Sequence, residues 1–131
     1  MLVYAQRLIG PQEIADIARY ASGLPPPEGN GQGDGRDLAR VAETFRSDCA
    51  ACHGDRAQGD AEHFVPRLEG QHYGYLLRQI RDIAAGRRGN AHPDMVALTA
   101  QYRDPELRAL ADYVSRIDAS GASEAAQEGG P

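Results

Sequence analysis

Cys49-Ala50-Ala51-Cys52-His53 is the pentapeptide that holds both cysteines of this 131-residue chain. Positions three residues apart lie on one face of a helix. Two thiols placed in this way can add to the two vinyl groups along one edge of a haem, and the residue after the second cysteine then lies over the iron. An imidazole there is the fifth ligand, so the C-x-x-C-H pattern is typical of c-type haem attachment. We therefore expect haem c bound through Cys49 and Cys52, with His53 on the iron.

Two interpretations without haem compete with this one. A thioredoxin-like dithiol needs a βαβ setting, and the sequence has no alternation of strand and helix patterns. A structural zinc site needs four ligands and usually a second cysteine pair, which His63 or His72 could replace only at loose spacing. A haem-free zinc or dithiol module therefore stays as a third hypothesis, and a visible spectrum of the matured protein tests it.

The composition favours helices and a core that side chains alone do not fill. Leu, Ile, Val and Phe make up less than a fifth of the chain, although only a quarter is charged and the net charge is −5. Ala outnumbers Val, Ile and Thr combined, which predicts an all-α fold. A buried porphyrin would supply the missing apolar bulk.

Several classes of protein are excluded by simple patterns. No apolar run approaches the 18 or so residues of a membrane span. The pI near 5.3 argues against nucleic acid as a partner, because phosphates require a basic face. No signal peptide is visible at the N-terminus.

Helical periodicity and turn residues divide the chain into segments. Residues 25–35, rich in Pro and Gly, are expected to form a linker that is stiff at its proline end and loose after it. Residues 118–131 are small and polar and are expected to be a disordered tail. Asp104 is the expected N-cap of the last helix. The predicted helices are Pro11–Gly23, Arg36–Cys49, Gln71–Ala85, Met95–Gln101 and Pro105–Ile117.

The order of motifs resembles class I c-type cytochromes, and more narrowly the C-terminal domain of tandem dihaem periplasmic cytochromes. The resemblance implies a class I cytochrome c fold, with helices packed around one covalently attached haem c, in a domain spanning residues 36–117. One departure is Val41, where the family usually has Gly at the crossing of its first and last helices. The matching features are Phe45, Cys49 to Gly54, Gly59, Pro66 to Gln71, Tyr75-Leu76, Gln79, Gly86 to Arg88, Met95 and Leu110 to Tyr113.

The resemblance also implies the second axial ligand. Met95 matches the family's methionine, which lies on the opposite haem face from the histidine. His92 is the main rival for this role, with His63 and His72 behind it. A methionine that only fills the core is the structural alternative.

Further residues around the haem are implied in the same way. Pro66 resembles the family proline whose carbonyl accepts a hydrogen bond from the other nitrogen of the axial imidazole, although it could simply stiffen a loop. Arg88, and with less support Arg78, could pair with haem propionates, because a guanidinium suits a carboxylate. Phe45 and Tyr113 are expected at the helix crossing.

An iron with His53 and Met95 as ligands has no open position for a substrate. We therefore expect a one-electron carrier, not an enzyme, that meets redox protein partners transiently, with neither nucleic acid nor a membrane span involved. The alternative is a haem-bearing relay domain or subunit of a larger dehydrogenase or terminal oxidase. Haem c attachment occurs outside the bacterial cytoplasm, so the resemblance implies the periplasm.

A short internal repeat suggests a second domain. Residues 13–22 and residues 106–115 share an aliphatic-x-x-aliphatic-Ala-x-Tyr pattern at a constant offset, and each segment follows a Pro. Residues 1–24 are accordingly expected to form an N-terminal helix resembling the end of a preceding cytochrome c domain. An extra helix packed on the same domain is the alternative.

Overall fold

The computed structural model describes residues 10–25, 29 and 31–117. The tail expected at 118–131, the first nine residues and part of the expected linker lie outside the described residues. All regular structure in the described part is helical, which confirms the all-α prediction; extended backbone pairs there only in a single antiparallel bridge between Asp60 and Val65. The helices are α2 (Pro11–Ser22), α3 (Leu38–Asp48), α4 (Ala50–His53), α5 (Tyr73–Ala84), α6 (Pro93–Thr99) and α7 (Asp104–Ser115).

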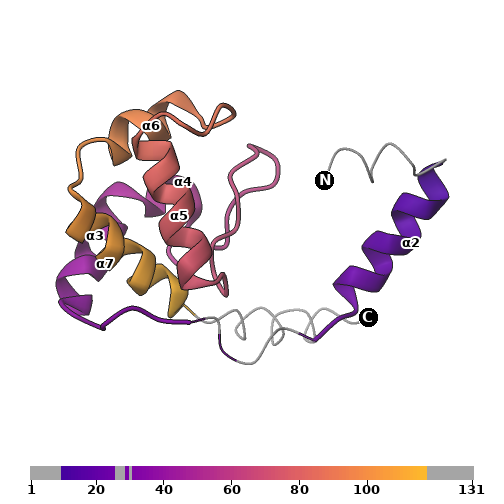
Figure 1. The fold of residues 1–131 in the computed structure, drawn as a ribbon, viewed down its shortest axis with the longest axis horizontal. Coiled ribbons are helices and arrows are strands. Elements are labelled where there is room, and N and C mark those ends of the chain that lie inside the picture. The colour runs from indigo at the N-terminus through magenta and orange to yellow at the C-terminus, as the bar shows by residue number, and fades with distance from the viewer. Residues whose placement is uncertain (1–9, 26–28, 30, 118–131) are drawn as a thin grey trace.

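Helices α3, α5 and α7 enclose the core. Helix α7 contacts both α3 and α5, and α3 and α7 lie side by side in Figure 1. Helix α6 packs on α5. The rings of Phe45 and Tyr113 meet at the α3–α7 contact with centroids 5.6 Å apart, as the sequence predicts. The apolar stripes of the three helices supply most of the buried side chains: Val41, Phe45, Leu76, Leu77, Leu110, Ala111 and Val114.

Four helix starts differ from the sequence prediction. Helix α5 begins at Tyr73 instead of Gln71, and α6 begins at Pro93 instead of Met95. The starts of α3 and α7 differ for local reasons. Helix α3 begins at Leu38 because Asp37 adopts a left-handed conformation with φ of 55°, which ends the preceding turn. The N-cap of α7 is Arg103, not Asp104, and its backbone N–H donates to Glu106 Oε2 at 2.8 Å. Asp104 instead accepts two hydrogen bonds from Arg81 of α5, at 2.6 and 2.9 Å.

Helix α2 lies apart from the other helices (Figure 1) and buries none of its residues. Ile14, Ile17 and Tyr20 on its apolar side are more than half exposed. The helix therefore forms through its own sequence, with Pro11 in the first turn and Gly23 at the end.

The end of the expected linker is attached to α7. The backbone N–H groups of Gly33 and Gly35 donate to the buried carboxylate of Asp112, at 2.9 and 2.7 Å. Arg116 Nε donates to the same carboxylate at 2.7 Å. A Cβ on Gly33 would lie 2.7 Å from Asp112, so the close approach requires glycine there. The glycine-rich half was expected to be loose, and this part of it is held in place.

No helix among the described residues has the length and apolar character needed to cross a membrane.

Candidate haem-binding site

The cysteines lie one helical turn apart at the start of α4. Helix α3 ends at Asp48, and Cys49 O accepts the backbone N–H groups of both Cys52 and His53, at 3.2 and 3.0 Å. Cys49 is half-buried and Cys52 is exposed, and no disulfide joins them. Burial, with smaller contributions from the charges of Asp48 and Cys52, raises the pKa of the Cys49 thiol to about 11. Both cysteines therefore lie in a single helical turn, and solvent reaches this turn at Cys52.

His53 is buried and holds a defined hydrogen bond. Its Nδ1 lies 3.0 Å from the carbonyl oxygen of Pro66, and the residue is only 7% exposed. A carbonyl can only accept, so Nδ1 carries the proton and donates, which leaves the lone pair on Nε2. This is the tautomer and the outer contact that metal-bound histidines have in proteins. The donor set at Cys49, Cys52 and His53 thus fits a covalently attached haem.

The loop after α4 is folded back against the Pro66 carbonyl. Gly59 N–H donates to His53 O at 2.8 Å, and Gly59 has φ of 73°. A Cβ at Gly59 would lie 2.6 Å from Arg67 N and 2.7 Å from the Pro66 carbonyl carbon. Only glycine permits this close approach, so the loop lies directly on the peptide group to which His53 donates.

Met95 is half-buried and lies in the first turn of α6, three residues after His92. Its carbonyl accepts a hydrogen bond from Thr99 Oγ1 at 2.7 Å, which fixes the backbone at this point. Its rival His92 is exposed and caps α6, because its Nδ1 accepts the N–H of Asp94 at 3.3 Å.

The other histidines lie elsewhere. His63 is exposed and its Nδ1 lies 2.6 Å from Asp60 Oδ2, while His72 is the exposed N-cap of α5. Within the described residues, no three His, Cys, Asp or Glu side chains gather as a metal site would require. The zinc hypothesis gains no support from this arrangement.

The two arginines considered for propionates differ in their surroundings. Arg88 is half-buried, and its Nε donates to Asn90 Oδ1 at 3.1 Å. Arg78 is exposed, with its guanidinium carbon 5.5 Å from the ring centroid of Tyr75. In the described part of the chain, neither arginine forms an ion pair with a carboxylate.

Sequence reasoning did not assign a role to Glu69, which is the most buried acidic side chain near Pro66. Its side chain is 2% exposed and pairs with two half-exposed arginines: Oε1 lies 2.9 Å from Arg67 Nη2 and Oε2 lies 3.4 Å from Arg56 Nη2. No periodicity indicates this cluster, because Arg56 lies 13 residues before Glu69 in the irregular connection between α4 and α5. The signal that could have identified Glu69 is its position inside the motif from Pro66 to Gln71.

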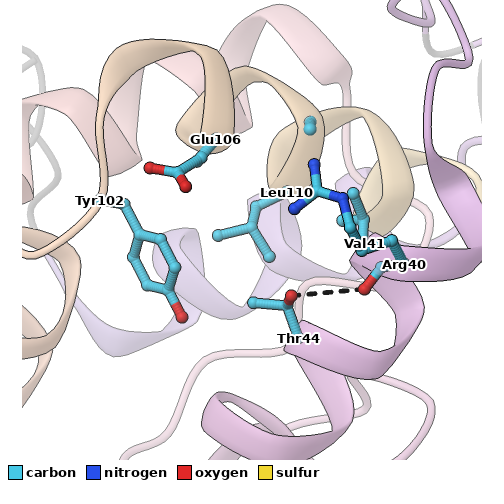
Figure 2. A pocket seen from close by; sticks show the side chains of 7 residues that line it. Arg40, Val41, Thr44, Tyr102, Glu106 and Leu110 are labelled. Atoms are coloured by element: carbon cyan, nitrogen blue, oxygen red, sulfur yellow. Dashed lines mark hydrogen bonds between the residues drawn. The ribbon is translucent and has the colours of Figure 1, made fainter.

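A small cavity of about 40 Å³ lies between α3 and α7 and is a separate feature (Figure 2). It has room for a few water molecules and none of its lining residues is a predicted ligand. Val41 lines it, so the residue that departs from the family's glycine stands beside imperfect packing at this crossing. Nearby, burial and the hydrogen bond that Tyr102 donates to Asp48 raise the pKa of the Tyr102 hydroxyl. The cavity is lined by Arg40, Val41, Thr44, Tyr102, Glu106, Ala109 and Leu110.

Comparison with known sequences supports one family. The sequence profile of the Cytochrome c family matches residues 38–118. Cytochrome c4 of Azotobacter vinelandii is 27% identical over 117 residues, which cover 81% of this chain and 54% of that protein. The Cbb3-type cytochrome c oxidase subunit FixP of Bradyrhizobium sp. (strain ORS 278) is 34% identical over 113 residues, covering 82% of this chain and 36% of that protein. The chain thus spans about half, or less, of the length of these relatives.

Comparison of structures agrees. The crystal structure of reduced recombinant cytochrome c4 from Pseudomonas stutzeri matches with a TM-score of 0.63 at 26% sequence identity, over 83% of this chain and 62% of that chain. This likeness confirms the expected class I cytochrome c fold. The chain belongs to the cytochrome c family, as an electron-transfer domain that carries haem c covalently on Cys49 and Cys52.

Proposed function

We propose that the chain is a one-electron carrier with a single haem c and with His53 and Met95 as the axial ligands. The observation that carries the proposal is the buried His53 ring, whose Nδ1 donates to the Pro66 carbonyl at 3.0 Å and leaves Nε2 for the metal. When bound, the haem supplies the Fe(II)/Fe(III) couple. Two strong protein ligands leave no position for a substrate, so we assign electron transfer and no catalysis.

Met95 is preferred to His92 for a local reason. The Nδ1 of His92 already accepts the Asp94 N–H at the start of α6, and the side chain is exposed. Met95 is half-buried on the same helix, and a thioether needs no hydrogen bond to be desolvated. A His/Met pair raises the reduction potential compared with stronger donor pairs.

Arg88 is the proposed partner of a haem propionate. It is half-buried, and the one described hydrogen bond of its side chain goes to a neutral amide oxygen, so its charge remains uncompensated. Arg78 is a weaker candidate, because it is exposed and lies over the Tyr75 ring.

Spectroscopy of the matured protein tests the ligands. We expect one haem per chain and, in the oxidised protein, a near-infrared charge-transfer band from sulfur to iron. Met95→Leu should abolish this band, while the matched change His92→Gln should preserve it. A wild-type protein without the band would contradict Met95, and colourless protein with two titratable thiols would contradict haem binding itself.

A second candidate function is a relay domain within a larger dehydrogenase or oxidase. The 34% identity with the FixP subunit of a cbb3-type oxidase favours it. The two functions differ in their assembly, because a free carrier meets its partners transiently through a small interface. Stable co-purification with a catalytic subunit would support the relay, whereas elution as a separate protein that still exchanges electrons would support the carrier.

We further propose that electrons leave at the haem edge beside the exposed Cys52, towards a redox protein in the periplasm. The net charge of −5 favours a partner with a basic docking face. Electron exchange with such a partner should weaken as ionic strength rises, because salt screens exposed charges. Stopped-flow mixing with a basic and an acidic redox protein at several salt concentrations measures the difference.

Helix α2 is proposed to be the last helix of a preceding cytochrome c domain. Its residues Ile14, Ile17, Ala18 and Ala21 align with α7 residues that are buried in this domain, yet all four are exposed. An apolar stripe of this kind requires a covering surface. The coding sequence upstream of Met1 tests the proposal, because it must contain a second in-frame C-x-x-C-H motif; a stop codon there would contradict it.

A further inference from the structure

We propose that Glu69 is a positioning residue for His53: through Arg67 and Arg56 it holds the Pro66 carbonyl in place and so lowers the reduction potential. The inference rests on the proposed ligation of iron by His53. It adds a group that touches neither the imidazole nor the iron.

The Pro66 carbonyl is not held by burial of its own residue. Pro66 and Arg67 are both exposed, although the carbonyl between them accepts the His53 Nδ1 proton. On one side the peptide group is supported by Gly59, whose backbone approaches closely enough to exclude a Cβ. Something must also hold the chain on the side that follows the carbonyl.

Glu69 provides a fixed point on that side. Its side chain is 2% exposed, and the backbone N–H groups of Leu68 and Glu69 both donate to Ala57 O, at 2.8 and 3.1 Å. Ala57 itself is completely buried. The carboxylate of Glu69 is therefore attached to the inner side of the loop that follows His53.

The carboxylate then joins the beginning and the end of the connection between α4 and α5 through charge. Oε1 of Glu69 lies 2.9 Å from Arg67 Nη2, and Oε2 lies 3.4 Å from Arg56 Nη2. Arg67 is the residue directly after the Pro66 carbonyl, and Arg56 lies in the loop after His53. A buried carboxylate depends on its partners, so both arginines are held in place, and Arg67 in turn restrains the Pro66–Arg67 peptide.

The position of this carbonyl affects the iron through the imidazole. A well-placed acceptor at Nδ1–H increases the electron density on Nε2, which makes the ring a stronger donor. A stronger donor stabilises Fe(III) relative to Fe(II) and lowers the potential. Loosening the Pro66 carbonyl should therefore raise the potential.

Two substitutions of opposite charge separate positioning from simple electrostatics. Glu69→Gln removes a negative charge and Arg67→Gln removes a positive one. If charge alone acts, the potential rises in Glu69→Gln and falls in Arg67→Gln. If positioning dominates, the potential of the matured protein rises in both variants, and a fall in Arg67→Gln would overturn the inference.

Proton exchange at His53 provides a direct measurement. In the reduced holoprotein, the Nδ1 proton should exchange about 10-fold faster in Glu69→Gln and in Arg67→Gln than in the wild type. The matched control is Glu43→Gln, which breaks an exposed pair with Arg46 on α3 and should leave the rate unchanged. Unchanged exchange in the first two variants overturns the positioning role.

The design also separates this inference from the ligation on which it rests. Wild-type holoprotein must show the His53 ring protons strongly shifted by the haem; if they are not, ligation by His53 is wrong and the inference falls with it. If Glu69→Gln does not yield holoprotein, Arg67→Gln still decides the matter, because Arg56 continues to pair with Glu69.

Discussion

Helices α2 and α7 have nearly the same pattern of residues and opposite environments. Both are twelve residues long, both carry Pro in the first turn, and both place aliphatic residues on one side. Ile17 of α2 is 53% exposed, whereas Leu110 at the matching position of α7 is 4% exposed. An amphipathic pattern therefore predicts the helix, and the presence of a complementary surface determines its burial.

Of these two helices, α7 alone has such a complementary surface among the described residues. The stripe of α7 packs against α3 and α5, which supply Phe45, Leu76 and Leu77 to the same cluster. Within the described residues, α2 buries none of its own residues. Residues of α7 should therefore stabilise the fold through their burial, whereas residues of α2 should not. Four comparisons of matching residues test this difference.

The largest expected effect comes from truncating the matching aliphatic residues. Leu110→Ala should lower the free energy of unfolding by about 2–5 kcal/mol, because it removes buried methyl groups and leaves a cavity. Ile17→Ala should change it by no more than about 0.5 kcal/mol, because the side chain already contacts water. Guanidinium unfolding of the holoprotein, followed by haem absorbance, measures both. Equal losses would mean that α2 is packed after all.

The next effect concerns Asp112, whose counterpart on α2 is Arg19. Burial alone would raise the pKa of Asp112, but hydrogen bonds from Arg116, Gly35 and Gly33 outweigh it and lower the pKa. Asp112→Asn should lower the free energy of unfolding by about 1–3 kcal/mol at neutral pH.

The pH dependence of this effect has a definite sign. A carboxyl whose folded pKa is lowered stabilises the fold above its ordinary pKa, and this contribution is lost as pH falls through the folded value. The wild type and Asp112→Asn should therefore converge in stability as pH falls below the ordinary carboxyl range. Unfolding curves at pH 7 and pH 3 measure the convergence; a difference that stays constant would contradict the charged hydrogen bonds.

Matching tyrosines give a smaller effect. The ring of Tyr113 packs on Phe45 with centroids 5.6 Å apart, whereas Tyr20 at the matching position is 71% exposed. Tyr113→Leu should cost about 0.5–1.5 kcal/mol through the lost aromatic contact. Tyr20→Leu should be neutral, and thermal unfolding of the holoprotein measures both variants. A clear loss from Tyr20→Leu would indicate that α2 contacts this domain.

The smallest effect is expected from exposed ion pairs. Arg81, and then Arg108, lower the pKa of Asp104 to about 2. Arg81→Gln should reduce Tm slightly, because the pair connects α5 with α7, and the reduction should vanish in high salt or as pH approaches 2. Arg19→Gln, which breaks a pair within α2, should leave Tm unchanged. Equal changes in Tm in the two variants would contradict a stabilising role for the pair between α5 and α7.

The sequence predicts the helices well because their periodicity is local. It misses details that depend on partners far along the chain. Asp104 was the expected N-cap of α7, but its carboxylate bonds to Arg81, which is 23 residues away. Gly33 was expected in a loose segment, and the residue that holds it, Asp112, is 79 residues away.

The same distinction applies to the haem site. Attachment of haem c through Cys49 and Cys52 could be predicted because the C-x-x-C-H spacing is typical of that chemistry, and the family match agrees. The role of His53 as an iron ligand remains a prediction. The contact between His53 and Pro66 followed from a family resemblance, and the structure places those atoms 3.0 Å apart. Glu69 could not be assigned a role, because its importance comes from burial and from two arginines at opposite ends of the irregular connection between α4 and α5. Assignments of Met95 and Arg88 remain predictions.

The hydrogen bonds from Gly33 and Gly35 to Asp112 shorten the tether between α2 and this domain. The chain between Ser22 and Gly33 spans at most about 40 Å even when fully extended. A domain attached to α2 would then have an effective concentration in the millimolar range relative to the domain that contains α7. A docking contact with a dissociation constant of about 1 mM, or −4.1 kcal/mol, would therefore be substantially occupied, although two separate molecules would hardly form it.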